Sequence, residues 1–188
     1  MRLSLIFPAL FMCWTSFTSG EECNVGSGVT ADILKCISIS YEQVDKKLNR
    51  EYIALSSKID PPHKGLLVEG ERAWARYKNA YCAAVFDSIF PGEEAGIEKE
   101  SCLVSMASSR LMELIYIDTG VHNGGFFNAL ALNAKVSSKT RDEILKQIIE
   151  QKARPEESLY FEKNCKLTGI LYKEEVRMCH ARMRFRDM

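Results

Sequence analysis

The 188-residue sequence predicts an all-α protein, an antiparallel helical bundle of three main helices with a smaller helical C-terminal segment, stapled by disulfides. Three observations predict this fold. Apolar residues recur at steps of three and four over long stretches, which is the spacing of one helix face. Proline and glycine stand at the ends of those stretches. An even number of cysteines follows the expected export signal.

Residues 1–20 have the pattern of a signal peptide. Arg2 supplies the positive start, Leu3–Trp14 is almost wholly apolar, and the small residues Thr18 and Gly20 favour cleavage after Gly20. The apolar run is short for about 30 Å of hydrocarbon. We therefore expect a periplasmic or secreted protein with no membrane insertion after cleavage; an uncleaved anchor is the alternative.

The first main helix is expected to begin at Thr30, an N-cap residue type, and to end at Asp60-Pro61-Pro62. Its apolar face consists of Ile33, Ile37, Tyr41, Val44, Leu48, Tyr52 and Leu55. A second helix is expected over residues 64–89 and a third over 95–117, joined by a turn at Pro91-Gly92-Glu93-Glu94. Three amphipathic helices with short connections predict an antiparallel bundle.

The pattern changes after residue 118, so we divide the mature chain into a helical domain, 21–118, and a C-terminal extension packed on it, 119–188. Glycines predict a loop over 118–128, and a weak strand signal follows over 129–136. A fourth helix is expected over 137–152, because Thr140 and Glu143 have the spacing of a capping box. Residues 158–185 are expected to form one or two short helices.

Six cysteines remain after removal of the signal peptide, and their even number in an exported chain favours three structural disulfides. The simplest connectivity is sequential, although fifteen are possible. It pairs Cys23 with Cys36, Cys82 with Cys102, and Cys165 with Cys179. Each loop of this size contributes on the order of 3 kcal/mol in the chain-entropy description.

The charge is balanced overall but not along the chain. Residues 21–118 carry 16 acidic and 11 basic side chains, whereas residues 119–188 carry 9 acidic and 13 basic ones. The first part is therefore suited to a basic partner and the basic tail to an acidic one. An exported protein has little use for the tail as a nucleic-acid patch, and no nucleic-acid partner is expected.

A spaced set of residues carries a family resemblance. Two early cysteines, Cys23 and Cys36, are followed by Asp45, Leu48-Asn49 and Tyr52 of the first helix. Cys82 comes after Glu71-Arg72-Ala73-Trp74 and Tyr77-Lys78-Asn79-Ala80, and Cys102 is followed by Arg110-Leu111 and Leu114. In this order and spacing, residues 23–114 resemble the LprI-type family of lysozyme-inhibitor-like periplasmic domains. Two positions depart from the family pattern, since Lys78 stands in place of an arginine and Asn79 in place of an aspartate.

Most of the matched residues are expected to be structural. Trp74 and Tyr77 lie three apart on one helix side and are expected to fill the core. Asp45, Arg72 and Arg110 fall on three different helices, and we expect them to form a partly buried ion network that fixes the helix register.

No enzyme chemistry is predicted, and neither is any cofactor or metal site. The sequence has no Gly-x-Ser-x-Gly elbow. Paired cysteines leave no thiol nucleophile, and the three histidines have no ligand spacing relative to a cysteine pair. Gly26-Ser27-Gly28 lacks the strand-to-helix setting of a phosphate loop.

The resemblance implies a protein that binds and inhibits a cell-wall-degrading enzyme such as lysozyme. The partner-binding candidates are the acidic turn at Glu93 and Glu94 and a glycine-rich loop at His122 and Asn123, in which His122 is expected to project. One alternative is an immunity protein against a toxin delivered to the periplasm, which the basic tail favours. Others are a structural envelope protein without an inhibitory role, and an envelope enzyme or small-ligand carrier. The oligomeric state stays open.

Overall fold

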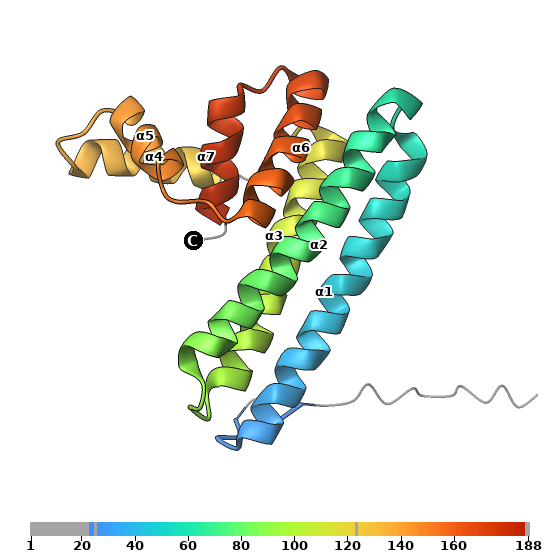
Figure 1. Cartoon of the computed structure of the whole chain (residues 1–188), viewed down its shortest axis with the longest axis vertical. Helices are drawn as coiled ribbons and strands as arrows, with labels where there is room; N and C mark the ends of the chain where they lie inside the picture. The colour runs from blue at the N-terminus through green and yellow to red at the C-terminus, as the bar shows by residue number, and fades with distance from the viewer. Residues whose placement is uncertain (1–22, 25, 123, 187–188) are drawn as a thin grey trace, which may run out of the picture.

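The computed structural model describes residues 23–24, 26–122 and 124–186 (Figure 1). These ranges contain the helices α1 (Thr30–Lys58), α2 (Pro61–Ile89), α3 (Ala95–Thr119), α4 (Gly125–Val136), α5 (Arg141–Ile149), α6 (Pro155–Tyr172) and α7 (Val176–Arg186). They contain no strand, and the predicted all-α class is confirmed. The predicted signal peptide, residues 1–20, lies outside the described residues.

Of the three longest helices, each runs antiparallel to the next one along the chain, as the sequence predicts (Figure 1). Helix α3 lies between α1 and α2 and packs along both. Leu48 and Leu55 of α1 are buried, and they belong to the apolar face that predicts this helix. The predicted capping role of Thr30 is wrong: Val29 occupies the N-cap position and Thr30 is already helical.

Proline and glycine set the ends of these helices. Helix α2 begins at Pro61 rather than near Lys64, because a proline fits the first helical position, where a backbone N–H has no intrahelical partner. Helix α3 ends at Gly120, whose φ of 70° is in the left-handed region. A Cβ at Gly120 would also lie 3.0 Å from the ring of Tyr172, so the close approach of α6 requires glycine there too.

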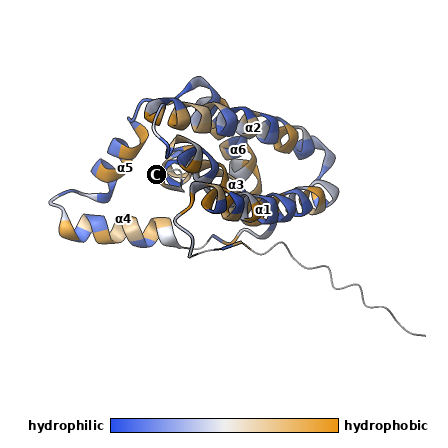
Figure 2. Cartoon of the chain, turned by 90° about the horizontal axis from the view of Figure 1, so that it is seen from below, coloured by the Kyte–Doolittle hydropathy of each residue, from blue (hydrophilic) through white to orange (hydrophobic). Residues whose placement is uncertain are grey.

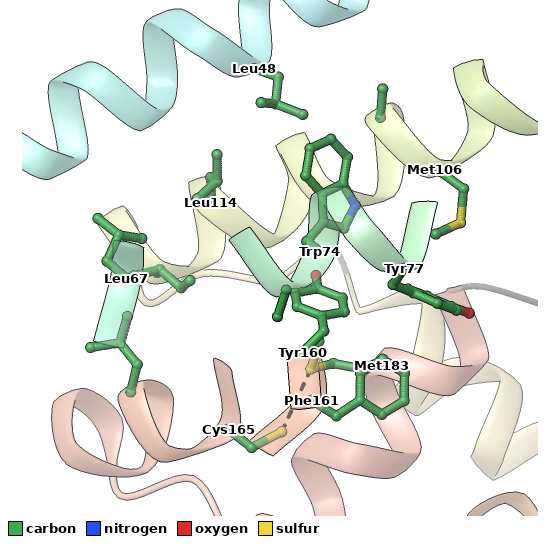
Figure 3. Packing of buried hydrophobic residues seen from close by; sticks show 14 of the residues in the cluster. Leu48, Leu67, Trp74, Tyr77, Met106, Leu114, Tyr160, Phe161, Cys165 and Met183 are labelled. Atoms are coloured by element: carbon green, nitrogen blue, oxygen red, sulfur yellow. Dashed lines mark hydrogen bonds between the residues drawn. The ribbon is translucent and has the colours of Figure 1, made fainter. Parts of the chain in front are cut away.

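The core of the bundle extends into the C-terminal segment. Helix α6 lies along α2, and α7 packs on α6. Leu67 and Trp74 of α2 and Leu114 of α3 belong to the same buried cluster as Phe161 and Cys165 of α6 (Figure 3). The division of the chain at residue 118 stays a prediction, but the main core does not end there.

The predicted loop over 118–128 and the weak strand over 129–136 are wrong over most of their length, because α4 begins at Gly125. Gly124, with a φ of 71°, forms the N-cap just before it. The glycines favoured a loop, whereas residues 129–134, Ala-Leu-Ala-Leu-Asn-Ala, are mostly strong helix formers. Phe126 and Leu130, four residues apart, turn the same face of α4 to a second cluster.

Helices α4 and α5 form an arm that projects from the bundle (Figure 2). Its small core joins α4 and α5 with Ala181 of α7. The capping box at the start of α5 is confirmed: the Glu143 backbone N–H donates to the Thr140 hydroxyl, and the Glu143 carboxylate accepts from the Thr140 backbone N–H at 2.6 Å. Helix α5 is shorter than the predicted 137–152.

Candidate interaction surface

The turn between α2 and α3, residues 90–94, closes the end of the bundle that lies farthest from α6 and α7 (Figure 1). Its backbone is hydrogen-bonded, since Gly92 N–H donates to the Ile89 carbonyl at 2.9 Å and Ala95 N–H to the Gly92 carbonyl at 3.1 Å. A Cβ at Gly92 would lie 2.9 Å from the Ile89 oxygen, so this tight turn requires glycine. The turn therefore has one compact shape.

The predicted disulfide between Cys82 and Cys102 is confirmed, and it ties α2 to α3 behind this turn. The two Cα atoms are 5.6 Å apart, and the bond closes a segment with a sequence separation of 20 residues. Cys82 is buried in the core. A buried cross-link on one side and the hydrogen-bonded turn on the other restrict the motion of the whole helical end.

Carboxylates gather at this end. We call residues 86–100 the acidic tip: they include Asp87, Glu93, Glu94, Glu98 and Glu100, against a single basic residue, Lys99. Glu93 and Glu94, the predicted partner-binding candidates, are exposed. None of the five carboxylates forms an ion pair with any residue that the structure describes.

An aromatic side chain stands among these charges. Phe90 is 65% exposed, and its ring stacks on that of Phe86 with the centroids 5.6 Å apart. The ammonium group of Lys99 lies over the Phe86 ring, 5.7 Å from its centroid. The acidic tip thus combines an exposed apolar ring with a surround of unpaired carboxylates.

The second candidate loop differs from expectation. His122 does not project, because its ring packs against Tyr116, at a centroid distance of 5.5 Å, and against Phe127, at 4.6 Å. Its Nδ1 atom is buried and has no hydrogen-bond partner among the residues that the structure describes. The start of α4 directly after Gly124 places Phe127 over the imidazole, which explains the difference. Asn123 lies outside the described residues.

The third predicted disulfide is not formed in the structure, where Cys23 and Cys36 are free thiols. Cys23 lies in the non-helical segment before α1, which a hydrogen bond from the Ser27 hydroxyl to Asp32, 2.5 Å long, holds to the helix. The two side chains interact as thiols instead. Contact with the Cys23 thiol is the main cause that raises the pKa of Cys36 to about 11.

The predicted network of Asp45, Arg72 and Arg110 is also wrong. Asp45 accepts a hydrogen bond from Asn49 of its own helix at 2.8 Å, and Arg72 is exposed. Arg110 is buried and pairs with Glu71, its Nη2 lying 2.8 Å from the Glu71 carboxylate. Successive helical residues point about 100° apart, so the register of α2 turns Glu71 rather than Arg72 toward α3.

Other matched residues hold the bundle together. Trp74 and Tyr77 are buried in the core. Lys78, which departs from the family pattern, donates to the Tyr41 hydroxyl at 2.7 Å, and its ammonium group lies over the Trp74 ring, 5.1 Å from the centroid. Lys78 therefore joins α2 to α1 through aromatic side chains.

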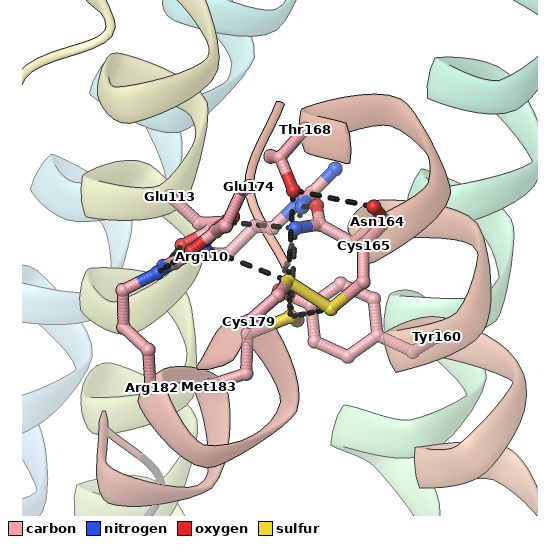
Figure 4. A network of polar contacts seen from close by, with 10 residues as sticks. All are labelled: Arg110, Glu113, Tyr160, Asn164, Cys165, Thr168, Glu174, Cys179, Arg182 and Met183. Carbon is pink, nitrogen blue, oxygen red and sulfur yellow. Dashed lines mark hydrogen bonds and ion pairs between the residues drawn. A yellow bond between two sulfur atoms is a disulfide. The ribbon is translucent and has the colours of Figure 1, made fainter. Parts of the chain in front are cut away.

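A buried polar network, which sequence reasoning missed, joins α3 to the C-terminal helices (Figure 4). Arg110 donates to the Asn164 amide oxygen at 2.8 Å, and the Asn164 amide nitrogen donates to Glu113 at 2.6 Å. Arg182 of α7 binds Glu113 at 3.0 Å through Nη2 and Glu174 at 2.8 Å through Nε. The predicted disulfide between Cys165 and Cys179 is confirmed beside this network.

The charges of this network support one another. Burial alone lowers the pKa of Arg182, but the negative charge of Glu113 and the hydrogen bonds to Glu113 and Glu174 outweigh it and raise the pKa above its usual value. Burial likewise lowers the pKa of Arg110, and Tyr160 and Glu71 more than offset it. Both guanidinium groups therefore stay charged in the core.

The basic tail is less available to a partner than its sequence suggests. Arg182 is buried in the network, and Arg184 is 9% exposed and pairs with Glu157. Arg177 lies 3.6 Å from Asp142. Two arginines of α7, Arg182 and Arg184, are thus used inside the molecule, whereas Arg177 stays exposed.

The described residues hold no group of histidine, cysteine, aspartate and glutamate side chains that could bind a metal ion. None of the described helices is both long enough and apolar enough to cross a membrane.

Neither the curated proteins nor the solved structures include a match to this chain. The sequence profile described as "Lysozyme inhibitor LprI" matches residues 21–114, half of the chain. The match contains α1, α2, most of α3, the Cys82–Cys102 disulfide and the buried Trp74, and the chain belongs to the LprI lysozyme inhibitor family.

Proposed function

We propose that this protein binds a cell-wall-degrading enzyme of the lysozyme type outside the cytoplasm and inhibits it, with the acidic tip as the contact surface. Membership of a lysozyme inhibitor family supports the class of partner. The unpaired carboxylates around Phe90 support the surface, and they are the observation that carries the proposal.

Electrostatics favours a partner with a basic surface. Lysozymes are usually basic, and five carboxylates against one lysine at the tip attract such an enzyme during encounter. Charges at the rim of an interface act mainly on the association rate and on its dependence on salt. We therefore expect association to slow as the ionic strength rises.

Phe90 supplies the apolar centre that an interface needs. Interfaces draw most of their binding free energy from a few residues, often aromatic ones, that are surrounded by polar groups. Phe90 is exposed in the free protein and rests on Phe86. Because the disulfide and the hydrogen-bonded turn fix its position, little conformational entropy is lost on binding.

The experiment exchanges charge at the tip. Glu93→Lys combined with Glu94→Lys is expected to weaken inhibition of a basic lysozyme at least about tenfold, through slower association, since like charges now face each other. The matched control is Glu42→Lys combined with Glu162→Lys, two exposed carboxylates on α1 and α6. Its net charge changes equally, so it separates a local contact from general attraction.

Two outcomes contradict the proposal. One is that neither the unaltered protein nor any variant inhibits a panel of basic wall-degrading enzymes. The other is that the tip variant and the control variant inhibit equally well. The alternative of an immunity protein, which the basic tail favoured, is less well supported, because Arg182 and Arg184 of that tail are buried in internal contacts.

A further inference from the structure

The structure contains a polar pocket that the acidic tip does not use. It lies where the connection between α5 and α6 passes α2 and α7, and it measures about 420 Å³. Pockets of about 300–1,000 Å³ are the size that holds small molecules. Tyr77 and Tyr81 of α2 line one side, while Gln151, Lys152 and Arg154 come from the α5–α6 connection and its junction with α6.

Arg184 also lines this pocket, and several contacts hold its side chain in one position. The side chain is 9% exposed. Its Nη1 donates to the carbonyls of Ile148 at 3.1 Å and Ile149 at 2.8 Å, and also to that of Gln151, while its Nε pairs with Glu157 at 3.1 Å. These contacts fix the plane of the guanidinium group.

One nitrogen atom of the guanidinium group takes part in none of these contacts. The Nη2 atom of Arg184 has no hydrogen-bond partner among the residues that the structure describes. Nη2 is not one of the fully buried polar atoms without a partner, so its two N–H donors stay accessible from the pocket that Arg184 lines. These donors can bind an acceptor that enters the pocket, and a carboxylate matches the planar guanidinium group.

The pocket lining has a net positive charge, which favours binding of an anion. Lys152, Arg154 and Arg184 are positive, and Glu157 is the only carboxylate in the lining. Lys152 and Arg154 are exposed at the rim, and no ion pair joins either of them to a described residue. Arg154 instead stacks over the Tyr81 ring, 4.9 Å from its centroid.

We propose that this pocket binds an anionic saccharide, a sugar ring that carries a carboxylate. The carboxylate would bind to Nη2 of Arg184 and to the rim cations Lys152 and Arg154. The sugar hydroxyls would pair with Gln151 and Glu157, which also line the pocket. The site does not depend on the acidic tip, and it would hold the protein on carboxylated glycan.

The test is a calorimetric titration of the purified protein with N-acetylmuramic acid and with N-acetylglucosamine, which lacks the lactyl carboxylate. Saturable binding of the first sugar in the millimolar range, with at least about tenfold weaker binding of the second, is expected. A short peptide with one carboxylate tests the other source of that group, and it is expected to bind more weakly than the acidic sugar.

Two pairs of substitutions locate the site. Lys152→Ala with Arg154→Ala removes exposed cations and is expected to weaken binding about tenfold. Arg72→Ala with Arg76→Ala is the matched control, because it removes equal charge from exposed positions on α2 outside this pocket, and it is expected to leave binding unchanged. Glu93→Lys with Glu94→Lys is also expected to leave sugar binding unchanged, which separates this site from the tip.

Three results overturn the proposal. The first is no saturable binding of N-acetylmuramic acid. The second is equal binding of the neutral sugar, or tighter binding of the peptide, because the ligand would then not be an acidic sugar. The third is an equal loss of affinity in both pairs of alanine variants, since the effect would then be general charge attraction rather than the pocket.

Discussion

Replacement of Arg182 by methionine tests the buried network that joins the C-terminal helices to the bundle. Arg182 is 1% exposed, and it balances Glu113, whose side chain is 2% exposed, and Glu174, at 8%. Methionine fills much of the volume but leaves two buried carboxylates without their cation. Removal of one partner from a buried pair typically costs about 3–5 kcal/mol.

One further contact adds to the size of the effect, and a second substitution tests its cause. The guanidinium group lies over the Tyr116 ring, 4.5 Å from its centroid, and loss of this contact adds about 0.5–2 kcal/mol. Removing the Glu113 charge in the same molecule, by Glu113→Gln, is expected to recover part of the loss, because the carboxylate no longer lacks a cation. Against a total stability of about 5–15 kcal/mol for a domain, Arg182→Met alone is severe.

The assay is urea unfolding followed by circular dichroism, with linear extrapolation to water. Arg177→Met is the matched control, because Arg177 lies on the same helix but is 43% exposed beside Asp142, where an ion pair contributes about 0–1 kcal/mol. The reasoning is refuted if Arg182→Met costs no more than Arg177→Met, or less than about 1 kcal/mol.

Three other predictions concern contacts that hold the C-terminal helices in place. Cys165→Ala with Cys179→Ala opens a loop with a sequence separation of 14 residues, so urea unfolding should show a loss of about 3 kcal/mol, and an unchanged midpoint would contradict this. Gly120→Ala forces a side chain into left-handed backbone and against the Tyr172 ring, so a thermal scan should show a loss of about 1–3 kcal/mol, whereas equal melting temperatures would argue against the strain. Burial raises the pKa of Tyr116 from 10.0 to about 12, so its contribution is complete below pH 10 and is lost as the pH rises through 12; Tyr116→Phe should abolish that alkaline loss of stability, and an identical decline in both proteins would contradict the assignment.

The long helices could be predicted because local signals agree with tertiary packing there. Apolar steps of three and four mark α1. Pro61 begins α2 because its ring fixes the backbone φ, and Gly120 caps the end of α3 because glycine can adopt the left-handed conformation. Helix α4 escaped prediction because the glycines before it carry a loop signal, although Gly124 serves as its cap. In such a case the local sequence contains both signals, and packing of Phe126 decides between them.

The polar partners could not be predicted, because they depend on long-range packing. Arg182 and Glu113 are 69 residues apart, and nothing near either residue indicates the other. One step of helix register decides that Glu71 rather than Arg72 meets Arg110. A charged residue within an apolar stretch, such as Glu113 before Leu114, was the one available signal that a buried partner exists.

The tip candidates were predictable because they rest on short-range features. Proline and glycine mark the turn, Glu93 and Glu94 follow directly, and the flanking Cys82 and Cys102 close the loop. His122 was misjudged since its partner Phe127 belongs to the helix that was missed. An error in one element thus became an error in one candidate site.

Hydrogen exchange of the complex with a basic lysozyme tests the central claim most directly. The free protein and the complex are compared by peptide mass over all helices. The account predicts that slowed exchange upon binding is concentrated in residues 86–100, around Phe90 and the two glutamates, with α4 and α5 unchanged. A saturated complex in which residues 86–100 exchange as fast as in the free protein would contradict it.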